Sequence, residues 1–209
     1  MASPFRKEKV EGGYMLIGLT GHSGAGKSTV AALFERAGYR VIDCDALVHS
    51  LYEDPRYAAL VAEAFGNEYL ADGKVDRKKL GALVFSDEKA LHKLNETVSP
   101  FIMSSVMAHI EKAKSEGVPT VLDAPLLFEY GLERCCESVI AVVCDIETAV
   151  KRLSVRDGRS ETELRSRLSS QHDAAFFRIH CDYILENNGD EETLARNFYD
   201  MEGRLAIRF

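Results

Sequence analysis

The sequence has no long apolar run, few cysteines and no excess of positive charge. No apolar run approaches the roughly 20 residues that a helix needs to cross a bilayer, so no membrane association is predicted. The five cysteines are odd in number and lack Cys-x-x-Cys spacing, which favours reduced thiols in a cytoplasmic protein over disulfides or zinc. The formal net charge of −7 disfavours a general nucleic-acid-binding surface.

The composition is that of an ordinary globular protein. Of the 209 residues, 46% are hydrophobic and 28% are charged. This length suits one sizeable domain, or a core domain with an insertion. Residues 1–13 contain no apolar signal core and are predicted to form a flexible polar leader.

The strongest motif runs from Gly21 to Ser28 and reads Gly-His-Ser-Gly-Ala-Gly-Lys-Ser. It matches the pattern G-x-x-x-x-G-K-[ST] completely. An apolar segment, residues 14–19, precedes it and predicts a buried strand, and residues 29–36 have helical spacing. Strand, glycine loop and helix are the context that a phosphate-binding loop requires.

The chemistry of this glycine loop follows from its residue types. Glycines allow successive backbone N–H groups to point at one phosphate group, and the positive end of the following helix adds to the attraction. Lys27 would reach the outer phosphates, and the Ser28 hydroxyl could be a ligand of Mg²⁺. The predicted phosphate-binding residues are Ser23, Gly24, Ala25, Gly26, Lys27, Ser28 and Thr29.

Two carboxylates follow the second predicted strand, residues 39–42. Asp43 and Asp45 come directly after it, and ligands of parallel α/β sheets collect at the carboxyl ends of the strands. At least one of them should therefore face a substrate bound beside the glycine loop. The other would cap the helix that begins near Ala46, a role that aspartate fills well.

Residues 54–115 have little strand character and much helical spacing. Helices are predicted over residues 57–65, 77–85 and 88–114, with a turn at residues 72–74. Pro100 is expected to interrupt or kink the last of these helices. The segment is interpreted as a helical insertion in an α/β core, and by analogy such insertions hold the second substrate.

Two further strands are predicted in the second half of the chain. Residues 120–125 form a strand that carries Asp123 near its end, and a carboxylate at this place in glycine-loop enzymes helps to hold Mg²⁺. A solvated turn aspartate before Pro125 is the alternative. Residues 138–143 are continuously apolar, as in a buried parallel strand, and Asp145 is expected to cap the next helix.

Five arginines fall between residues 152 and 167 on a helix–turn–helix segment. Arg152 and Arg156 are four positions apart and share one helix face. Such a segment is typical of a lid over a polyphosphate, because guanidinium groups bind phosphate oxygens in pairs. Pairing with nearby glutamates on a solvated surface is the alternative, and we assign it to Arg159 and Arg165.

The chain closes with a predicted strand over residues 181–185 and a helix over residues 191–205. The loop between them contains Asn187 and Gly189 and lies at the carboxyl end of a strand. It could contact an adenine through backbone groups, or serve only as the turn before the helix.

Taken in order, these motifs resemble those of the dephospho-coenzyme A kinase family over nearly the whole chain from Tyr14. The resemblance rests on the glycine loop, the Asp-x-Asp segment, Pro-Leu-Leu-Phe-Glu at residues 125–129, Arg152 with Arg156, Arg167 with Gln171, and Asp182 with Asn187 and Gly189. His22, Ser23 and Ala25 differ from the usual family loop, and Ser99 stands where the family often has histidine.

The resemblance implies transfer of the γ-phosphoryl group of ATP, with Mg²⁺, to the 3′-hydroxyl of the dephospho-CoA ribose. It implies a P-loop kinase α/β fold: a three-layer parallel sheet core with a helical substrate-binding insertion and a helical lid. The expected boundaries are a core over residues 14–53, 116–150 and 178–209, a CoA-side insertion over residues 54–115, and a lid over residues 151–177. The partners would be ATP and dephospho-CoA, with a monomer favoured.

The mechanistic hypothesis assigns catalytic roles to Lys27, Asp45 and Arg156. Asp45 would accept or orient the proton of the attacking hydroxyl, and Arg156 with Arg152 would close over the transferring group. Asn187 and Gly189 would contact the nucleotide, and Ser28 and Asp123 would hold the metal.

Two other functions share parts of this pattern. A nucleoside or nucleoside-monophosphate kinase has the same loop, lid and insertion. A guanine-nucleotide switch is disfavoured, because the sequence has no Asn-Lys-x-Asp motif and places Asp-Ala-Pro-Leu where a switch has Asp-x-x-Gly.

Overall fold

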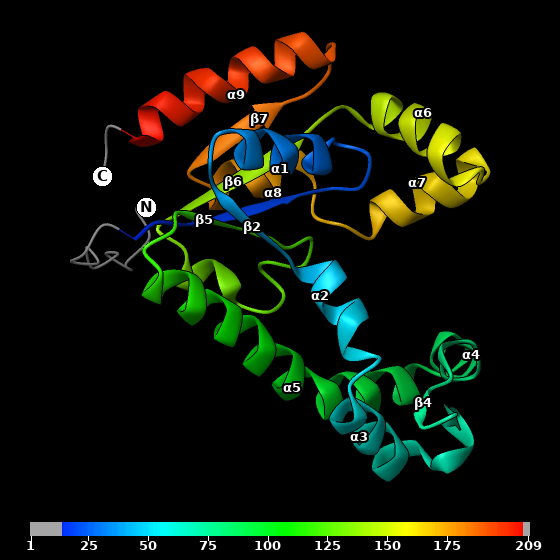
Figure 1. Ribbon diagram of the computed structural model, residues 1–209. Helices are drawn as coiled ribbons and strands as arrows, with labels where there is room; N and C mark the ends of the chain where they lie inside the picture. Colours follow the sequence, from blue (N-terminus) through cyan, green and yellow to red (C-terminus); the bar gives the residue numbers. More distant parts are fainter. Residues whose placement is uncertain (1–13, 207–209) are drawn as a thin grey trace. The chain divides into compact units, whose positions relative to one another are not determined.

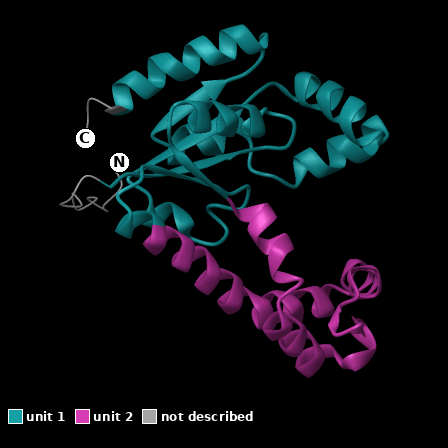
Figure 2. Cartoon of the chain, viewed as in Figure 1, with its two compact units in different colours: residues 1–42, 113–209 teal, residues 43–112 magenta. Residues whose placement is uncertain are grey.

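The computed structural model describes residues 14–206 and divides into two compact units. The first unit contains residues up to 42 and from 113 onward, and the second contains residues 43–112 (Figure 2). The predicted leader, residues 1–13, lies outside the described residues. Among the described helices, none is long and apolar enough to cross a membrane.

A five-stranded sheet forms the centre of the first unit (Figure 1). Its spatial order is β2-β5-β1-β6-β7, so the strand that leads into the glycine loop is central, and β1 pairs in parallel with both β5 and β6. The strands are β1 (Leu16–Gly21), β2 (Arg40–Asp43), β5 (Thr120–Asp123), β6 (Ser138–Val143) and β7 (Tyr183–Glu186).

Both faces of this sheet are covered by helices. On one face, Ile140 and Val142 of β6 pack in the cluster that contains Phe34 and Phe198, whose rings meet edge to face at 4.7 Å. On the other face, Ala141 and Val143 pack against Phe177. Successive side chains of β6 thus point alternately to the two covered faces of the sheet. This explains its continuously apolar sequence, since a strand covered on both sides has no polar face. The helices of this unit are α1 (Lys27–Arg36), α6 (Ile146–Asp157), α7 (Glu161–Ser169), α8 (Ala174–His180) and α9 (Glu191–Ala206), with a short 3₁₀ helix η2 (Leu132–Cys135).

The helix boundaries follow local sequence signals. The Asp145 carboxylate accepts a hydrogen bond from Thr148 N at 2.7 Å and caps α6, as predicted. Gly158, with φ 64°, ends α6 in the left-handed conformation, and Ser160 with Glu163 forms a capping box that starts α7. The sequence analysis predicted no helix at α8, which spans the boundary expected at residue 177.

The second unit is mostly helical and has its own core, around Tyr57, Val61 and Leu80. Its helices are α2 (Cys44–Leu51), α3 (Pro55–Phe65), η1 (Asn67–Tyr69), α4 (Arg77–Ser86) and α5 (Glu88–Ser115), the last of which re-enters the first unit at Ala113. The unit starts at Asp43 and so includes α2, before the insertion boundary expected at residue 54.

Two features of the second unit were not predicted. The helix α5 continues through Pro100, so of the two expected effects the interruption is wrong and the kink stays a prediction; proline removes one backbone N–H there without ending the helix. The predicted turn at residues 72–74 joins β3 (Leu70–Ala71) and β4 (Lys74–Val75) into a small antiparallel ribbon. Strands of two residues are too short to produce an alternating pattern.

Candidate active site

The glycine loop connects the end of β1 to the start of α1. Gly24 and Gly26 have φ angles of 78° and 96°, in the left-handed region that favours glycine. A Cβ atom on Gly26 would lie 2.3 Å from the Asn187 side-chain nitrogen, so there is no room for a larger residue at this position. The first turn of α1 carries no acidic residue, which leaves its positive end free to attract an anion.

Lys27 and Asp123 meet beside this loop. Lys27 is the first residue of α1, and Asp123 is the last residue of β5, paired in register with Leu19 of β1. The Lys27 ammonium forms an ion pair with the Asp123 carboxylate, whose side chain is only 8% exposed. The buried aspartate therefore fixes the direction in which the lysine side chain leaves the loop.

The other predicted loop residues differ in their exposure. Ala25 is buried, Ser28 is exposed, and Ser23 and Thr29 are half-buried. Thr29 N donates to the carbonyl oxygen of Gly26 at 3.1 Å, which closes the first turn of α1. The Ser28 hydroxyl is thus accessible at the start of α1, where a phosphate-bound metal would need an oxygen ligand.

Asn187 ties the loop after β7 to the glycine loop. Its side-chain nitrogen donates to Ala25 O at 2.8 Å, and its backbone nitrogen donates to Val143 O at 2.8 Å. Arg152 reaches the same place from α6, with hydrogen bonds to the carbonyl oxygens of Asn187 at 3.0 Å and of Gly24 and Gly189 at 3.4 Å. The Arg152 guanidinium therefore binds carbonyl groups of both loops, a contact that the sequence analysis did not foresee.

Replacement of Asn187 by alanine is expected to destabilise the first unit. The residue is 6% exposed, and its loss would leave the Ala25 carbonyl and the Arg152 guanidinium each without one partner. We expect the free energy of unfolding to fall by about 1–3 kcal/mol, measured by urea denaturation. The matched control is Asn188→Ala, since Asn188 is exposed and its side-chain oxygen accepts a hydrogen bond from the exposed Asp145 N. Equal stability of the two variants would contradict the stabilising role of the Asn187 side chain between the two loops.

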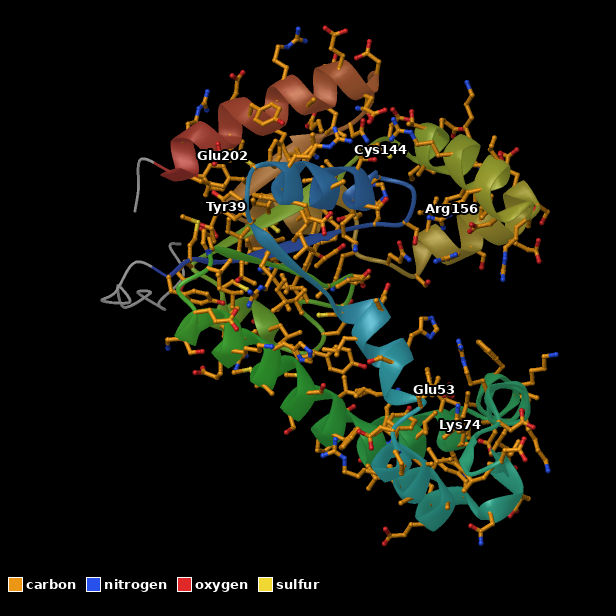
Figure 3. All side chains as sticks on the ribbon, viewed as in Figure 1. Tyr39, Glu53, Lys74, Cys144, Arg156 and Glu202 are labelled. Carbon is orange, nitrogen blue, oxygen red and sulfur yellow. The ribbon has the colours of Figure 1, made fainter. Side chains whose placement is uncertain are left out.

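Arg156 lies near the C-terminal end of α6 (Figure 3). Its guanidinium pairs with Asp157 at 2.6 Å and remains 62% exposed. This hydrogen bond raises the pKa of Arg156 and lowers that of Asp157, so both groups are charged around neutral pH. Arg167 from α7 also approaches Asp157, at 3.4 Å. An exposed guanidinium paired with a side-chain carboxylate can exchange that partner for a phosphate.

Arg165 has the surface role expected for it. Its guanidinium pairs with Glu147 at 2.7 Å and with Glu161 at 2.8 Å. These side-chain hydrogen bonds, to Glu147 first, raise the pKa of Arg165. Arg159 is exposed in the turn after Gly158.

Asp43, the last residue of β2, and Asp45 differ in what their carboxylates contact. Asp43 caps α2, because its carboxylate accepts a hydrogen bond from Ala46 N at 2.9 Å. Asp45 is exposed in the first turn of α2. Both aspartates are exposed, and they differ in that Asp43 is engaged as the cap of α2.

Two residues near the loop were not assigned to the site by the sequence analysis. Gln171 bonds Ser23 across 148 positions, and His22 contacts the backbone of Cys144. Gln171 was noted only as part of the family resemblance, since sequence spacing gives no indication of a contact over that distance. Burial raises the pKa of the Cys144 thiol, so this cysteine is neutral beneath the loop.

The parallel sheet, the glycine loop and the flanking helices define a P-loop kinase of the α/β class. A family model described as dephospho-CoA kinase matches residues 15–193. The dephospho-CoA kinase of Shouchella clausii is 38% identical over 196 residues, which cover 92% of this chain and 99% of that protein. The chain belongs to the dephospho-CoA kinase family, and it is a kinase enzyme.

Solved structures share this fold. A Thermus thermophilus protein is 34% identical, with a TM-score of 0.74 over 91% of this chain and 97% of that one. The dephospho-CoA kinase of Campylobacter jejuni, at 23% identity, has a TM-score of 0.71 over 92% of this chain and 97% of its own. This second likeness bears on the fold alone, and it confirms the predicted P-loop kinase architecture.

Proposed function

We propose that the chain transfers the γ-phosphoryl group of Mg²⁺-ATP to the 3′-hydroxyl of dephospho-CoA, with Lys27, Asp45 and Arg156 as catalytic residues. The observation that carries the nucleotide part is the glycine loop, whose left-handed glycines and helix N-terminus form an anion-binding cradle around Lys27. Family membership supplies the acceptor.

Lys27 would stabilise charge on the outer phosphates. Its ion-pair partner, Asp123, orients the ammonium and keeps it beside the glycine loop. A fixed cation placed where charge develops is the main means of catalysis in phosphoryl transfer, which requires little covalent chemistry from the protein. Residues 23–29 would bind the phosphates, with Asn187, Gly189 and Arg152 supporting the nucleotide side.

Mg²⁺ would be held by the Ser28 hydroxyl together with phosphate oxygens, with Asp123 nearby. The donor set fits, since magnesium in nucleotide sites takes one or two protein oxygens and completes its shell with phosphate and water. When bound, the ion would neutralise charge on the phosphates. Because Asp123 is already paired with Lys27, its contribution to the metal would be through water or through the lysine's position.

Asp45 would take or orient the proton of the attacking hydroxyl. The support is its place just after β2, its exposed carboxylate, and its match to the family's Asp-x-Asp segment.

Arg156 would bind the transferring group after leaving Asp157, and closure of α6–α7 over the nucleotide would exclude water. The second unit would hold the CoA side of the acceptor. A cytoplasmic location, expected from an odd number of cysteines without Cys-x-x-Cys spacing, and a monomeric state stay predictions.

An ADP-release assay with parallel acceptors tests the proposal. Dephospho-CoA, AMP, CMP and adenosine would each be offered with ATP and Mg²⁺. We expect turnover with dephospho-CoA and background rates with the other three. Turnover confined to a nucleoside or a monophosphate would establish the alternative kinase instead.

A further inference from the structure

Both ends of the α6–α7 helical pair are bonded to adjacent residues of the glycine loop. At the start, the residue before the α6 cap is Cys144, and the His22 ring nitrogen Nε2 lies 3.1 Å from its backbone nitrogen and 3.0 Å from its carbonyl oxygen. At the end, two residues beyond α7, lies Gln171. Cys144, just before the helical pair, and Gln171, just after it, are thus hydrogen-bonded to His22 and Ser23, which are neighbours in sequence.

Gln171 makes two complementary hydrogen bonds with Ser23. The Ser23 backbone N–H donates to Gln171 Oε1 at 2.9 Å, and Gln171 Nε2 donates to Ser23 Oγ at 3.0 Å. The donor and the acceptor of the Gln171 carboxamide therefore both bond to Ser23. Gln171 is held in turn by its own backbone, since its N–H donates to Leu168 O at 3.1 Å.

The residue after Gln171 is fixed to the body of the first unit. The His172 ring stacks on Phe176 of α8, with ring centroids 3.6 Å apart and planes 6° from parallel. Its Nε2 lies 3.4 Å from Glu129. Gln171 therefore stands between a fixed residue and the helical pair, at the position where a movement of the pair would begin.

The helical pair itself is packed as one body. Leu153 of α6 and Leu164 of α7 are 1% and 0% exposed and belong to one apolar cluster, while Arg156 at the far end is exposed. If such a packed pair rotates as a rigid body, its hinges are the short connections at its two ends. Any such rotation would pass through Gln171 and act on Ser23.

We propose that Gln171 is a positioning residue: its paired hydrogen bonds to Ser23 hold the glycine loop in its phosphate-binding conformation and join it to the end of the α6–α7 lid. The inference rests on the proposed function, in that the loop binds ATP. Gln171 acts through Ser23 and does not itself take part in phosphoryl transfer, for which Lys27, Asp45 and Arg156 are proposed. Because the loop is held before the nucleotide arrives, less ordering is needed on binding.

Binding of the non-hydrolysable analogue AMP-PNP with Mg²⁺, measured by calorimetry, tests the proposal without any acceptor. Gln171→Leu removes both hydrogen bonds and is expected to weaken binding about 10-fold, and Ser23→Ala removes one and should weaken it about 3-fold. The double variant should bind as Gln171→Leu does, because the Ser23 hydroxyl acts through Gln171. Ser169→Ala is the matched control, since Ser169 is exposed and its hydroxyl donates to Ser166 O within α7.

Steady-state kinetics separate positioning from a purely structural role. Gln171→Leu should raise the KM for ATP and leave the KM for dephospho-CoA within about twofold, whereas a structural role would lower the melting temperature and leave affinity unchanged. A folded Gln171→Leu protein with wild-type affinity for AMP-PNP, or single effects that multiply in the double variant, would overturn the proposal. Failure of the wild-type enzyme to turn over dephospho-CoA, with AMP-PNP still bound, would instead overturn the proposed function.

Discussion

Asp45→Asn is expected to lower kcat by about 10²-fold or more and to leave ATP affinity near its wild-type value. Asparagine is nearly isosteric with aspartate but has no basic carboxylate to receive the proton of the attacking hydroxyl. Asp45 is exposed in the first turn of α2, so the substitution breaks no packing. Initial-rate kinetics with dephospho-CoA, together with AMP-PNP binding, give the two quantities.

Asp43→Asn is the matched control for this prediction. It also removes one carboxylate, two positions away, but the asparagine oxygen can still accept the hydrogen bond from Ala46 N and cap α2. We expect kcat of Asp43→Asn to stay within about threefold of wild type, well below the loss expected for a general base. Unchanged turnover in Asp45→Asn, or a greater loss in Asp43→Asn, would remove Asp45 from the role of base.

Lys27→Ala is expected to reduce kcat/KM for ATP by about 10²-fold or more, because it removes a fixed cation from the phosphates. The same change takes the ammonium partner from the Asp123 carboxylate, which is 8% exposed. The free energy of unfolding should therefore also fall, by about 1–3 kcal/mol, less than for a fully buried pair because Lys27 is 19% exposed. Kinetics with varied ATP and urea denaturation measure the two effects.

Lys114→Ala is the control for charge alone. Lys114 is exposed near the end of α5, and its loss changes the net charge by the same amount. Both kcat/KM and stability should stay near wild type in this variant. If Lys27→Ala kept its kcat/KM for ATP, the glycine loop would bind phosphate without its lysine, and the proposed role of Lys27 would be wrong.

The sequence was most informative where chemistry and local structure depend on the same few residues. The glycine loop required particular residue types at fixed spacing, so its strand, loop and helix were predicted together with Lys27. The Asp145 cap could be predicted for the same reason, since a helix cap depends on neighbours within a turn. The continuous apolar run of β6 likewise predicted a strand covered on both faces.

Contacts between distant segments were much less predictable. The Asp123 carboxylate was recognised as important, but its ion pair with Lys27 depends on the register of β5 against β1. The role of Arg152 at the nucleotide stays a prediction, and its hydrogen bonds to three carbonyl oxygens from loops that are distant in sequence were not foreseen. Local propensity also failed at Pro100, where the flanking residues keep the helix continuous through a residue that disfavours it.

Figure 3 also shows two contacts that the sequence analysis did not assign. Tyr39, just before β2, donates a hydrogen bond to Glu202 of α9 at 3.2 Å, and burial together with this carboxylate raises the pKa of Tyr39 to about 12. In the second unit, Lys74 of β4 pairs with Glu53, and both side chains are more than half exposed. An exposed pair of this kind contributes little to stability.

The site of phosphorylation on the product tests the central claim most directly. The enzyme would be incubated with ATP, Mg²⁺ and dephospho-CoA, and the product would be analysed by mass spectrometry and by phosphorus NMR. The account predicts one added phosphate for each ADP released, carried as a monoester on the ribose 3′-oxygen. ADP release without a phosphorylated acceptor, or a phosphate at any other position, would contradict it.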